Sequence, residues 1–191
     1  MTRMLVPLLM AFANVLAATP ALASEWQTQP GSTLGFAAEA QGEKFSGAFE
    51  RFEARIRFAP DALTGSRFEV EIDLKSVNSQ NTERDEMLAD EAFFNSAAEP
   101  AASYFAERFS RLEDGRFRAD GVLTLRGVSA PVPLDFSWTG DASAATLEGE
   151  ASLDRIAFNV GAGEWSDAEA ITHHVSVRTK LVLTAKPSTT P

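Results

Sequence analysis

The sequence predicts an all-β protein, an antiparallel barrel or sandwich with one short helical insert. Many short segments alternate between apolar and polar residues, and side chains on a strand point alternately to the two faces of a sheet. Turn residues such as Pro30-Gly31 and Asp114-Gly115 separate these segments at short, even intervals. One stretch, residues 83–90, has a composition that suits a helix better than a strand.

The first 23 residues have the pattern of a secretory signal peptide. Arg3 gives a short positive region, residues 5–18 are apolar but too short to span a bilayer, and Ala21-Leu22-Ala23 has the small-x-small form of a cleavage site. We expect cleavage after Ala23, a mature chain with no integral membrane segment, and a periplasmic location. An uncleaved N-terminal membrane anchor is the alternative.

Alternation predicts the strands of the mature chain. In chain order they cover residues 25–29, 33–41, 45–58, 67–74, 103–109, 117–125, 132–138, 145–153 and 171–185. The apolar phase of the third segment changes between Phe49 and Phe52, so we expect a β-bulge at Glu50 and Arg51. The register of residues 103–109 is ambiguous, and we place Phe105 on the inward face.

The hairpin built from residues 117–125 and 132–138 alternates clearly between apolar and polar residues, with only Val122 out of pattern. Gly127 allows the turn between its two arms. Pro131 and Pro133 have no N–H group to donate to a ladder, so their strand is expected to have an edge or a bulge there.

The predicted helix lies between the fourth and fifth strands. Asn81 or Thr82 can cap its N-terminus, where acidic residues suit the positive end of the helix dipole. Leu88, Phe93 and Phe94 are apolar, so the insert is expected either to cover a ligand as a lid or to plug one end of the barrel. Further on, residues 155–165 form a glycine-rich loop.

Four segments carry a resemblance to a known family. They are Thr82–Leu88 leading through Phe93-Phe94 to Pro100, Gly121–Leu134, Leu153–Arg155 followed by Phe158, and Glu164–Asp167 before the last strand. By their order and spacing, residues 24–185 resemble the YceI-like family of periplasmic polyisoprenoid-binding proteins. The resemblance selects a lipocalin-like barrel of about eight strands over the sandwich. It implies that the barrel holds a long apolar ligand. Residues 186–191, at the end of the chain, are expected to form a disordered tail.

Composition narrows the class of partner. A hydrophobic content of 45% is enough for a core and too low for an integral membrane protein. The formal net charge of -10 argues against nucleic acids and anionic membrane surfaces, and the absence of cysteine excludes disulfides and thiolate metal sites. We expect no metal and no cofactor other than a bound lipid such as a polyprenyl chain or an isoprenoid quinone. A homodimer is left open.

The candidate ligand-binding residues are inward-facing apolar side chains and a few residues of the resemblance motifs. They are Phe36, Phe49, Ala54, Ile56, Phe68, Val70, Ile72, Leu88, Phe93, Phe94, Phe105, Ala119, Leu123, Leu125, Leu134, Phe136, Trp138, Leu147, Phe158, Trp165, His173 and Val175. Small inward residues such as Ala54 and Gly121 fit a hollow barrel, but they also fit a filled one in which small and large residues interdigitate. The resemblance favours the hollow barrel.

Several polar residues have two interpretations. His173 is expected to face inward near a barrel mouth as a hydrogen-bonded rim residue rather than as a haem or metal ligand, with His174 on the solvated face. Asp154 and Arg155 are expected to pair and fix a loop. Arg84, with Asp85, forms either an exposed ion pair or a contact to a ligand head group.

Two other classes of function compete with lipid binding. An apolar barrel can also host haem or a quinone in a redox or stress-response role. A hydrolase would have to use Asp85, Asp154 or His173, yet the sequence contains no nucleophile elbow, no Ser-His-Asp order and no metal-ligand spacing. No catalytic residue is assigned.

Overall fold

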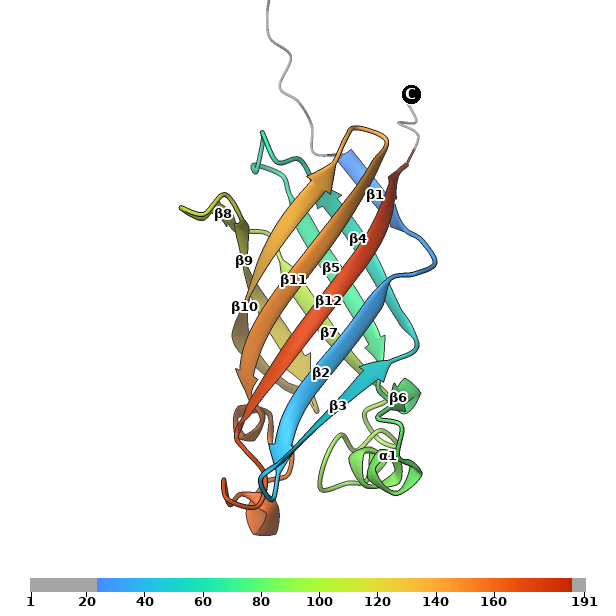
Figure 1. Ribbon diagram of the computed structural model, residues 1–191, viewed down its shortest axis with the longest axis vertical. Coiled ribbons are helices and arrows are strands. Elements are labelled where there is room, and N and C mark those ends of the chain that lie inside the picture. The colour runs from blue at the N-terminus through green and yellow to red at the C-terminus, as the bar shows by residue number, and fades with distance from the viewer. Residues whose placement is uncertain (1–23, 187–191) are drawn as a thin grey trace, which may run out of the picture.

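The computed structural model describes residues 24–186, which form a closed antiparallel barrel (Figure 1). Around the ring the strands are β1 (Ser24–Thr28), β4 (Phe52–Phe58), β5 (Arg67–Asp73), β7 (Ala101–Ala106), β9 (Phe117–Leu125), β10 (Val128–Gly140), β11 (Ala144–Asp154) and β12 (His174–Ala185). Strand β1 pairs with both β4 and β12, which closes the ring. The prediction of an all-β barrel of about eight strands with a short helical insert is therefore confirmed.

Three further strands extend the barrel at one end. β2 (Thr33–Ala40) pairs with β12 beyond β1, β3 (Glu43–Phe49) pairs with β2, and β6 (Val77–Asn78) pairs with β3. Helix α1 (Thr82–Ala89) lies at this end, together with the short 3-10 helices η2 (Arg155–Phe158) and η3 (Gly163–Trp165) (Figure 1). We call it the helix end; β1 and the last residues of β12 lie at the opposite, terminal end (Figure 1).

The change of face predicted near Glu50 and Arg51 is present, but the predicted β-bulge is wrong, because the chain breaks there between two separate strands, β3 and β4. Glu50 and Arg51 leave the ladder and bond to the chain around η1 (Leu74–Ser76): the Glu50 N–H donates to the Ser76 carbonyl, and the Asp73 N–H donates to the Arg51 carbonyl. Phe49 and Phe52 consequently both line the interior, in spite of their opposite sequence phases.

A second change of face, between β7 and β8 (Phe109–Arg111), makes the inward placement of Phe105 wrong. Ser103 opposes Thr124 and Phe109 opposes Ala119, so six residue steps on this side match five on β9. The extra residue reverses the alternation, because each slip by one residue moves side chains to the other face. Phe105 is 37% exposed and lies under the Arg67 guanidinium, 4.8 Å from the ring centre.

The β9–β10 hairpin has the predicted turn and the predicted sheet edge. Arg126 and Gly127 have φ angles of 52° and 70°, as a two-residue hairpin turn requires. Strand β10 pairs with β9 from Val128 onward, but its pairing with β11 is recorded only from Asp135. Pro131 and Pro133 lie in the stretch before Asp135. Because prolines have no N–H group to donate, this stretch is a poor template for pairing with another strand.

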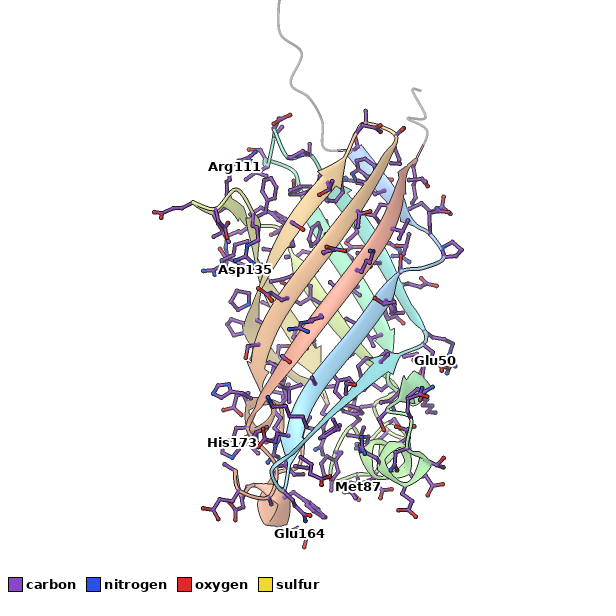
Figure 2. The ribbon with its side chains drawn as sticks, in the orientation of Figure 1. Glu50, Met87, Arg111, Asp135, Glu164 and His173 are labelled. Carbon is purple, nitrogen blue, oxygen red and sulfur yellow. The ribbon has the colours of Figure 1, made fainter. Side chains whose placement is uncertain are left out.

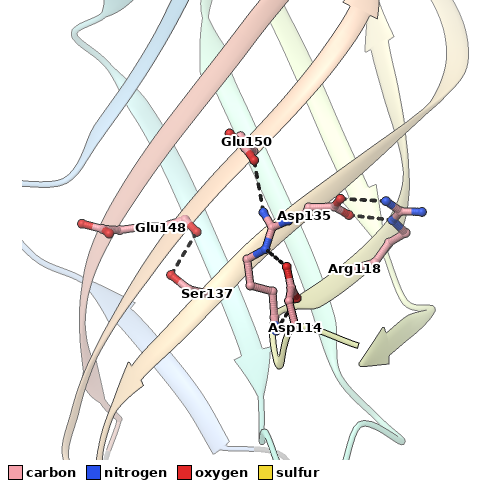
Figure 3. Close-up of polar contacts among 7 residues, drawn as sticks. Asp114, Arg118, Asp135, Ser137, Glu148 and Glu150 are labelled. Carbon is pink, nitrogen blue, oxygen red and sulfur yellow. Dashed lines mark hydrogen bonds and ion pairs between the residues drawn. The ribbon is translucent and has the colours of Figure 1, made fainter. Parts of the chain in front are cut away.

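Ion pairs cross the outer wall where β9, β10 and β11 meet (Figure 3). Arg118 binds both carboxylate oxygens of Asp135, at 2.6 and 2.7 Å, and Arg116 bridges Asp114 and Glu150 at 2.7 and 3.1 Å. Hydrogen bonds from Arg118 hold the pKa of Asp135 below its usual value. These side chains are partly exposed, from 22% for Asp135 to 60% for Glu150, so the pairs orient neighbouring strands more than they stabilise the fold.

The terminal half of the barrel is filled with aromatic side chains. Phe58, Phe68 and Phe136 are almost completely buried, and the Phe58 ring packs edge-on against Phe117 at 5.1 Å between centroids. Ala119 has no exposed surface within this cluster. A second cluster surrounds the helix end, where it lines an open space rather than filling it. The sequence left open whether the barrel is filled with side chains or hollow. The structure is filled in the terminal half and hollow in the half at the helix end.

Replacement of Ala119 by Trp should overpack the filled half. We expect a loss of about 1–3 kcal/mol or more in the free energy of unfolding, because the closed aromatic cluster leaves no room for an indole. Denaturant unfolding measures the change, with Ala37→Trp on the exposed face of β2 as the control. Equal midpoints for the two variants would contradict a filled terminal half.

Candidate ligand-binding cavity

The hollow half encloses a cavity of about 530 Å³ whose lining is mainly apolar. Most strands contribute side chains to it, together with α1, the segment after α1, and the loop residues Arg155, Val160 and Ile171. The candidate residues that line this cavity are Phe36, Phe49, Ala54, Ile56, Phe68, Val70, Ile72, Leu88, Phe93, Phe94, Leu123, Leu125, Leu134, Leu147 and Val175. The structure therefore brings most of the predicted set together around one space.

Three candidates lie in the filled half instead of the cavity. Ala119 and Phe136 are completely buried within the aromatic cluster, and Trp138 packs against it. The Trp138 ring lies 5.0 Å from that of Trp26, edge to face. Their inward orientation is as predicted, but alternation says nothing about the position of a residue along the barrel axis. Phe105, on the outer face, is a fourth candidate outside the cavity.

The remaining candidates lie in the segment that closes the helix end. Phe158 is buried in the core around the cavity, and the Trp165 ring packs on Phe93 at 5.7 Å. His173 precedes the last strand, which starts at His174, so its predicted inward strand position is wrong. Its Nε2 lies 2.8 Å from the Ser166 carbonyl oxygen, a hydrogen bond that ties two loop segments together at this end (Figure 2).

Helix α1 covers the helix end largely as predicted. The Asn81 side chain accepts a hydrogen bond from the Arg84 N–H at 3.0 Å, which caps the helix. Leu88, Phe93 and Phe94 are buried beneath it, and the Phe94 ring lies 5.8 Å from that of Phe49. The insert thus seals part of this end with apolar side chains.

The cavity meets solvent between the β2–β3 turn and the start of α1. Here its lining includes exposed polar residues, namely Gln41, Glu43, Lys44, Asn81 and Glu83. Arg84 lies over the Phe45 ring, 4.6 Å from its centre, whereas the Asp85 carboxylate accepts from the Ser79 N–H at 2.8 Å. Met87 is 41% exposed on the adjacent face of α1 (Figure 2). Arg84 and Asp85 therefore do not form the ion pair that was one of the two expectations for them.

Arg155 fixes the closing segment, residues 155–173, by hydrogen bonds to main-chain carbonyls of that segment. All five guanidinium N–H groups donate to carbonyls, Nε to Thr172, one terminal nitrogen to Val160 and Gly161, and the other to Trp165 and Ile171, at 2.6–3.1 Å. The side chain is buried, which lowers the pKa of Arg155, while nearby Asp154 partly offsets this shift.

The expected role of Arg155 in fixing a loop agrees with these contacts, but the expected partner is wrong. The Asp154 carboxylate accepts from the Ile156 N–H at 2.9 Å and caps η2 instead. Gly161 has a φ of 61°, and a Cβ there would lie 2.7 Å from an Arg155 nitrogen. Because all five guanidinium donors bind main-chain carbonyls, one side chain holds five positions of the backbone in place.

Sequence reasoning missed Tyr104, which lines the cavity where Phe105 was expected. The signal was present in the alternation, since Ala102, Tyr104 and Ala106 share one phase and the two alanines are buried. The pattern was obscured by Phe109. This residue lies on the opposite phase from Tyr104, yet it also faces inward, because one extra residue between β7 and β8 reverses the alternation.

Residues 24–186 contain no group of three His, Asp or Glu side chains placed to hold a metal ion. Within the same residues no helix is both long and apolar enough to cross a membrane.

Comparisons with known proteins agree with this architecture. Residues 26–183 match the model of the YceI-like domain. A UPF0312 protein of Shewanella denitrificans is 30% identical over 95 residues, which cover 50% of each chain. One of Yersinia pestis is 32% identical over 94 residues, 49% of this chain and 48% of that one. The matched region thus spans about half the length of these curated relatives.

Three solved structures share the fold. BcnA of Burkholderia cenocepacia superposes with a TM-score of 0.75 at 23% identity, covering 79% of this chain and 95% of that one. A polyisoprenoid binding domain from Saccharophagus degradans, implicated in plant cell wall breakdown, gives 0.65 at 17% identity, covering 87% and 100%. The YCEI protein of Campylobacter jejuni gives 0.64 at 21% identity, covering 74% and 85%.

Replacement of Arg155 by Leu should unfold the closing segment or the whole barrel. Five main-chain carbonyls, two of them buried, lose their donor at once, so we expect a loss of at least about 3 kcal/mol in the free energy of unfolding. Arg155→Lys should lie between this variant and the native protein, because an ammonium has only three donors. Thermal and denaturant unfolding measure the effect. A variant as stable as the surface control Arg178→Leu would contradict the role of Arg155.

Proposed function

Because the chain belongs to the YceI-like family, we propose that it binds one long-chain lipid of the polyisoprenoid kind inside its barrel and sequesters or carries it. The observation that carries the proposal is the cavity of the helix end, with an apolar interior and polar groups at its rim. Its volume of about 530 Å³ falls within the usual range for small-molecule sites.

The distribution of polar groups favours an amphiphile that enters with its chain first. Inside the cavity the Arg155 donors are all engaged by carbonyls, and the Tyr104 hydroxyl donates to the Ala119 carbonyl at 3.3 Å. At the rim, Lys44 and Arg84 offer positive charge to a polar head group, and Glu43 and Glu83 offer negative charge. A chain gains about 0.8 kcal/mol for each methylene it buries, before the cost of its own ordering.

A fold neighbour supports this class of ligand. The Saccharophagus degradans structure is that of a polyisoprenoid binding domain, and its fold covers most of this chain. An isoprenoid quinone has the same kind of chain and differs in its head group. Haem is disfavoured because His173, the side chain considered as an axial ligand, is turned to a loop carbonyl and does not line the cavity.

The role we propose is binding without catalysis. The three side chains that a hydrolase would need are each engaged with a main-chain group: Asp85 with the Ser79 N–H, Asp154 with the Ile156 N–H, and His173 with the Ser166 carbonyl. They belong to three different segments of the helix end, and none of the three lines the cavity.

We also propose that the protein acts in the periplasm after removal of residues 1–23, which lie outside the described part of the chain. Intact mass measurement of protein from a periplasmic fraction should give a chain that starts at Ser24. A cytoplasmic protein that retains Met1 would contradict this location.

Extraction of the purified protein tests the ligand. Organic extraction and mass spectrometry should recover a long-chain lipid from native protein, and Ala151→Trp, which places an indole in the cavity lining, should lower its amount at least about tenfold. The melting temperature of delipidated Ala151→Trp should stay close to native, since the ring enters empty space. Ala37→Trp, on the exposed face of β2, is the matched control.

Two results would count against the proposal. Native-level lipid in Ala151→Trp would place the ligand elsewhere. Visible absorbance in the purified protein, with no long-chain lipid in the extract, would favour the haem alternative.

A further inference from the structure

The mouth of the cavity lies beside a strand that has a free edge. Within residues 24–186, β3 pairs with β2 from Glu43 to Ala48, but on its other side it pairs with β6 only at Ala48 and Phe49. The first residues of β3 therefore have no partner strand on that side. Phe45 from this part of β3 and Arg84 from the start of α1 both line the cavity here.

One side-chain contact joins α1 to β3 at the mouth. The Arg84 guanidinium lies over the Phe45 ring, with 4.6 Å between its central carbon and the ring centre. The Phe45 ring packs edge-on against Phe36 at 6.4 Å between centroids, and the Phe36 ring lies 5.6 Å from that of Phe49. All three rings line the cavity, so its aromatic wall ends at the mouth beneath a cation that is attracted to the last ring.

The Arg84 guanidinium is held by that ring but has no acceptor in the protein. Within residues 24–186 it forms no ion pair with a carboxylate, and the hydrogen bond that Arg84 donates, to Asn81, comes from its main-chain N–H. Arg155, the other arginine of the cavity lining, differs because all its donors bind carbonyls. Arg84 thus presents free N–H donors where the apolar interior meets solvent.

The other charged side chains of the mouth are less well placed to bind a ligand. Glu43, Lys44 and Glu83 are exposed, whereas Arg84 is half-buried. Lys44 follows the opposite phase from the inward-facing Phe45, so it is directed to the outer face of β3, across from Glu39 on β2. Water and salt screen exposed charges strongly, so the half-buried guanidinium has the largest influence on a group that rests beside it.

We infer that Arg84 binds the head group of the lipid and selects a head group that carries a carboxylate or a phosphate. The inference rests on the proposed function, since it concerns the head of an amphiphile whose chain fills the cavity. A planar guanidinium with free donors matches two oxygens of such a group, while its face stays on the Phe45 ring. An alcohol offers one uncharged oxygen, and an ammonium group is repelled.

Lipids with the same oleyl chain and different head groups test the inference. Oleic acid, oleyl phosphate, oleyl alcohol and oleylamine each displace the neutral dye Nile red from delipidated mature protein, at a pH at which the carboxyl group is ionised. Because the chains are alike, differences in affinity report the head group. For the native protein, the acid and the phosphate should bind at least about tenfold more tightly than the alcohol, and the amine should bind most weakly.

Variants of the mouth assign the preference to one side chain. Arg84→Gln should remove the preference for the acid and the phosphate over the alcohol. Arg178→Gln removes the same charge from an exposed position on β12 and should keep the native preference. A preference that survives in Arg84→Gln and disappears in Lys44→Gln would overturn the inference.

Arg84→Lys separates geometry from charge, and it decides the matter if Arg84→Gln does not fold. Lysine keeps the positive charge but loses the planar pair of donors, so the preference should fall at least about threefold without disappearing. An unchanged preference in Arg84→Lys would overturn bidentate binding at this position.

Failure of the inference and failure of the proposed function give different results. Equal binding of acid, phosphate and alcohol by the native protein overturns the inference and leaves lipid binding intact. A native protein that binds none of the oleyl compounds removes the proposed function and the inference with it. Inorganic phosphate should not compete with oleyl phosphate; competition at the same concentration would show that a free anion is the ligand and would overturn the inference.

Discussion

The aromatic packing of the terminal half is the interaction on which the rest of this barrel depends. An eight-stranded barrel is just wide enough to be filled by side chains or to hold one ligand, and this chain does each in a different half. Phe58 and Phe136 are completely buried, and the contact between their rings joins strands β4 and β10 from opposite sides of the barrel. Because this half is closely packed, the other half can remain hollow, although an empty space costs stability through lost contacts.

The helix end is held by interactions of another kind. Its connections are fixed by side chains that bond to main-chain groups, with Arg155 on five carbonyls, Asn81 on the start of α1 and His173 on the Ser166 carbonyl. Such contacts set the path of irregular segments that have no ladder of their own. They leave the interior surface mainly apolar, since these polar groups are engaged by main-chain groups of the loops and of α1.

The two halves together explain how one fold can combine stability with an open site. Polar groups gather where the cavity meets solvent, near Lys44 and Arg84, and the outer wall carries ion pairs such as Arg118 with Asp135. A ligand with an apolar chain and a polar head matches that gradient. Tyr104 lies at the junction of the two halves, where its ring lines the cavity and fills the space over Gly121.

The sequence by itself determined the fold class, the helix with a cap at Asn81 or Thr82, the β9–β10 turn and the inward face of most strands, because alternation and turn chemistry are local properties. It even located the change of face at Glu50 and Arg51, where apolar residues mark both phases. Only the tertiary structure decided that Phe105 points outward, since the extra residue after β7 shows up only against the register of β9. It also decided that Ala119 lies in the filled half and Ala54 beside the cavity, because height along the barrel follows from pairing between distant strands. The partners of Arg155 could not be found in advance, since main-chain carbonyls are the same at every residue and leave no trace in the sequence.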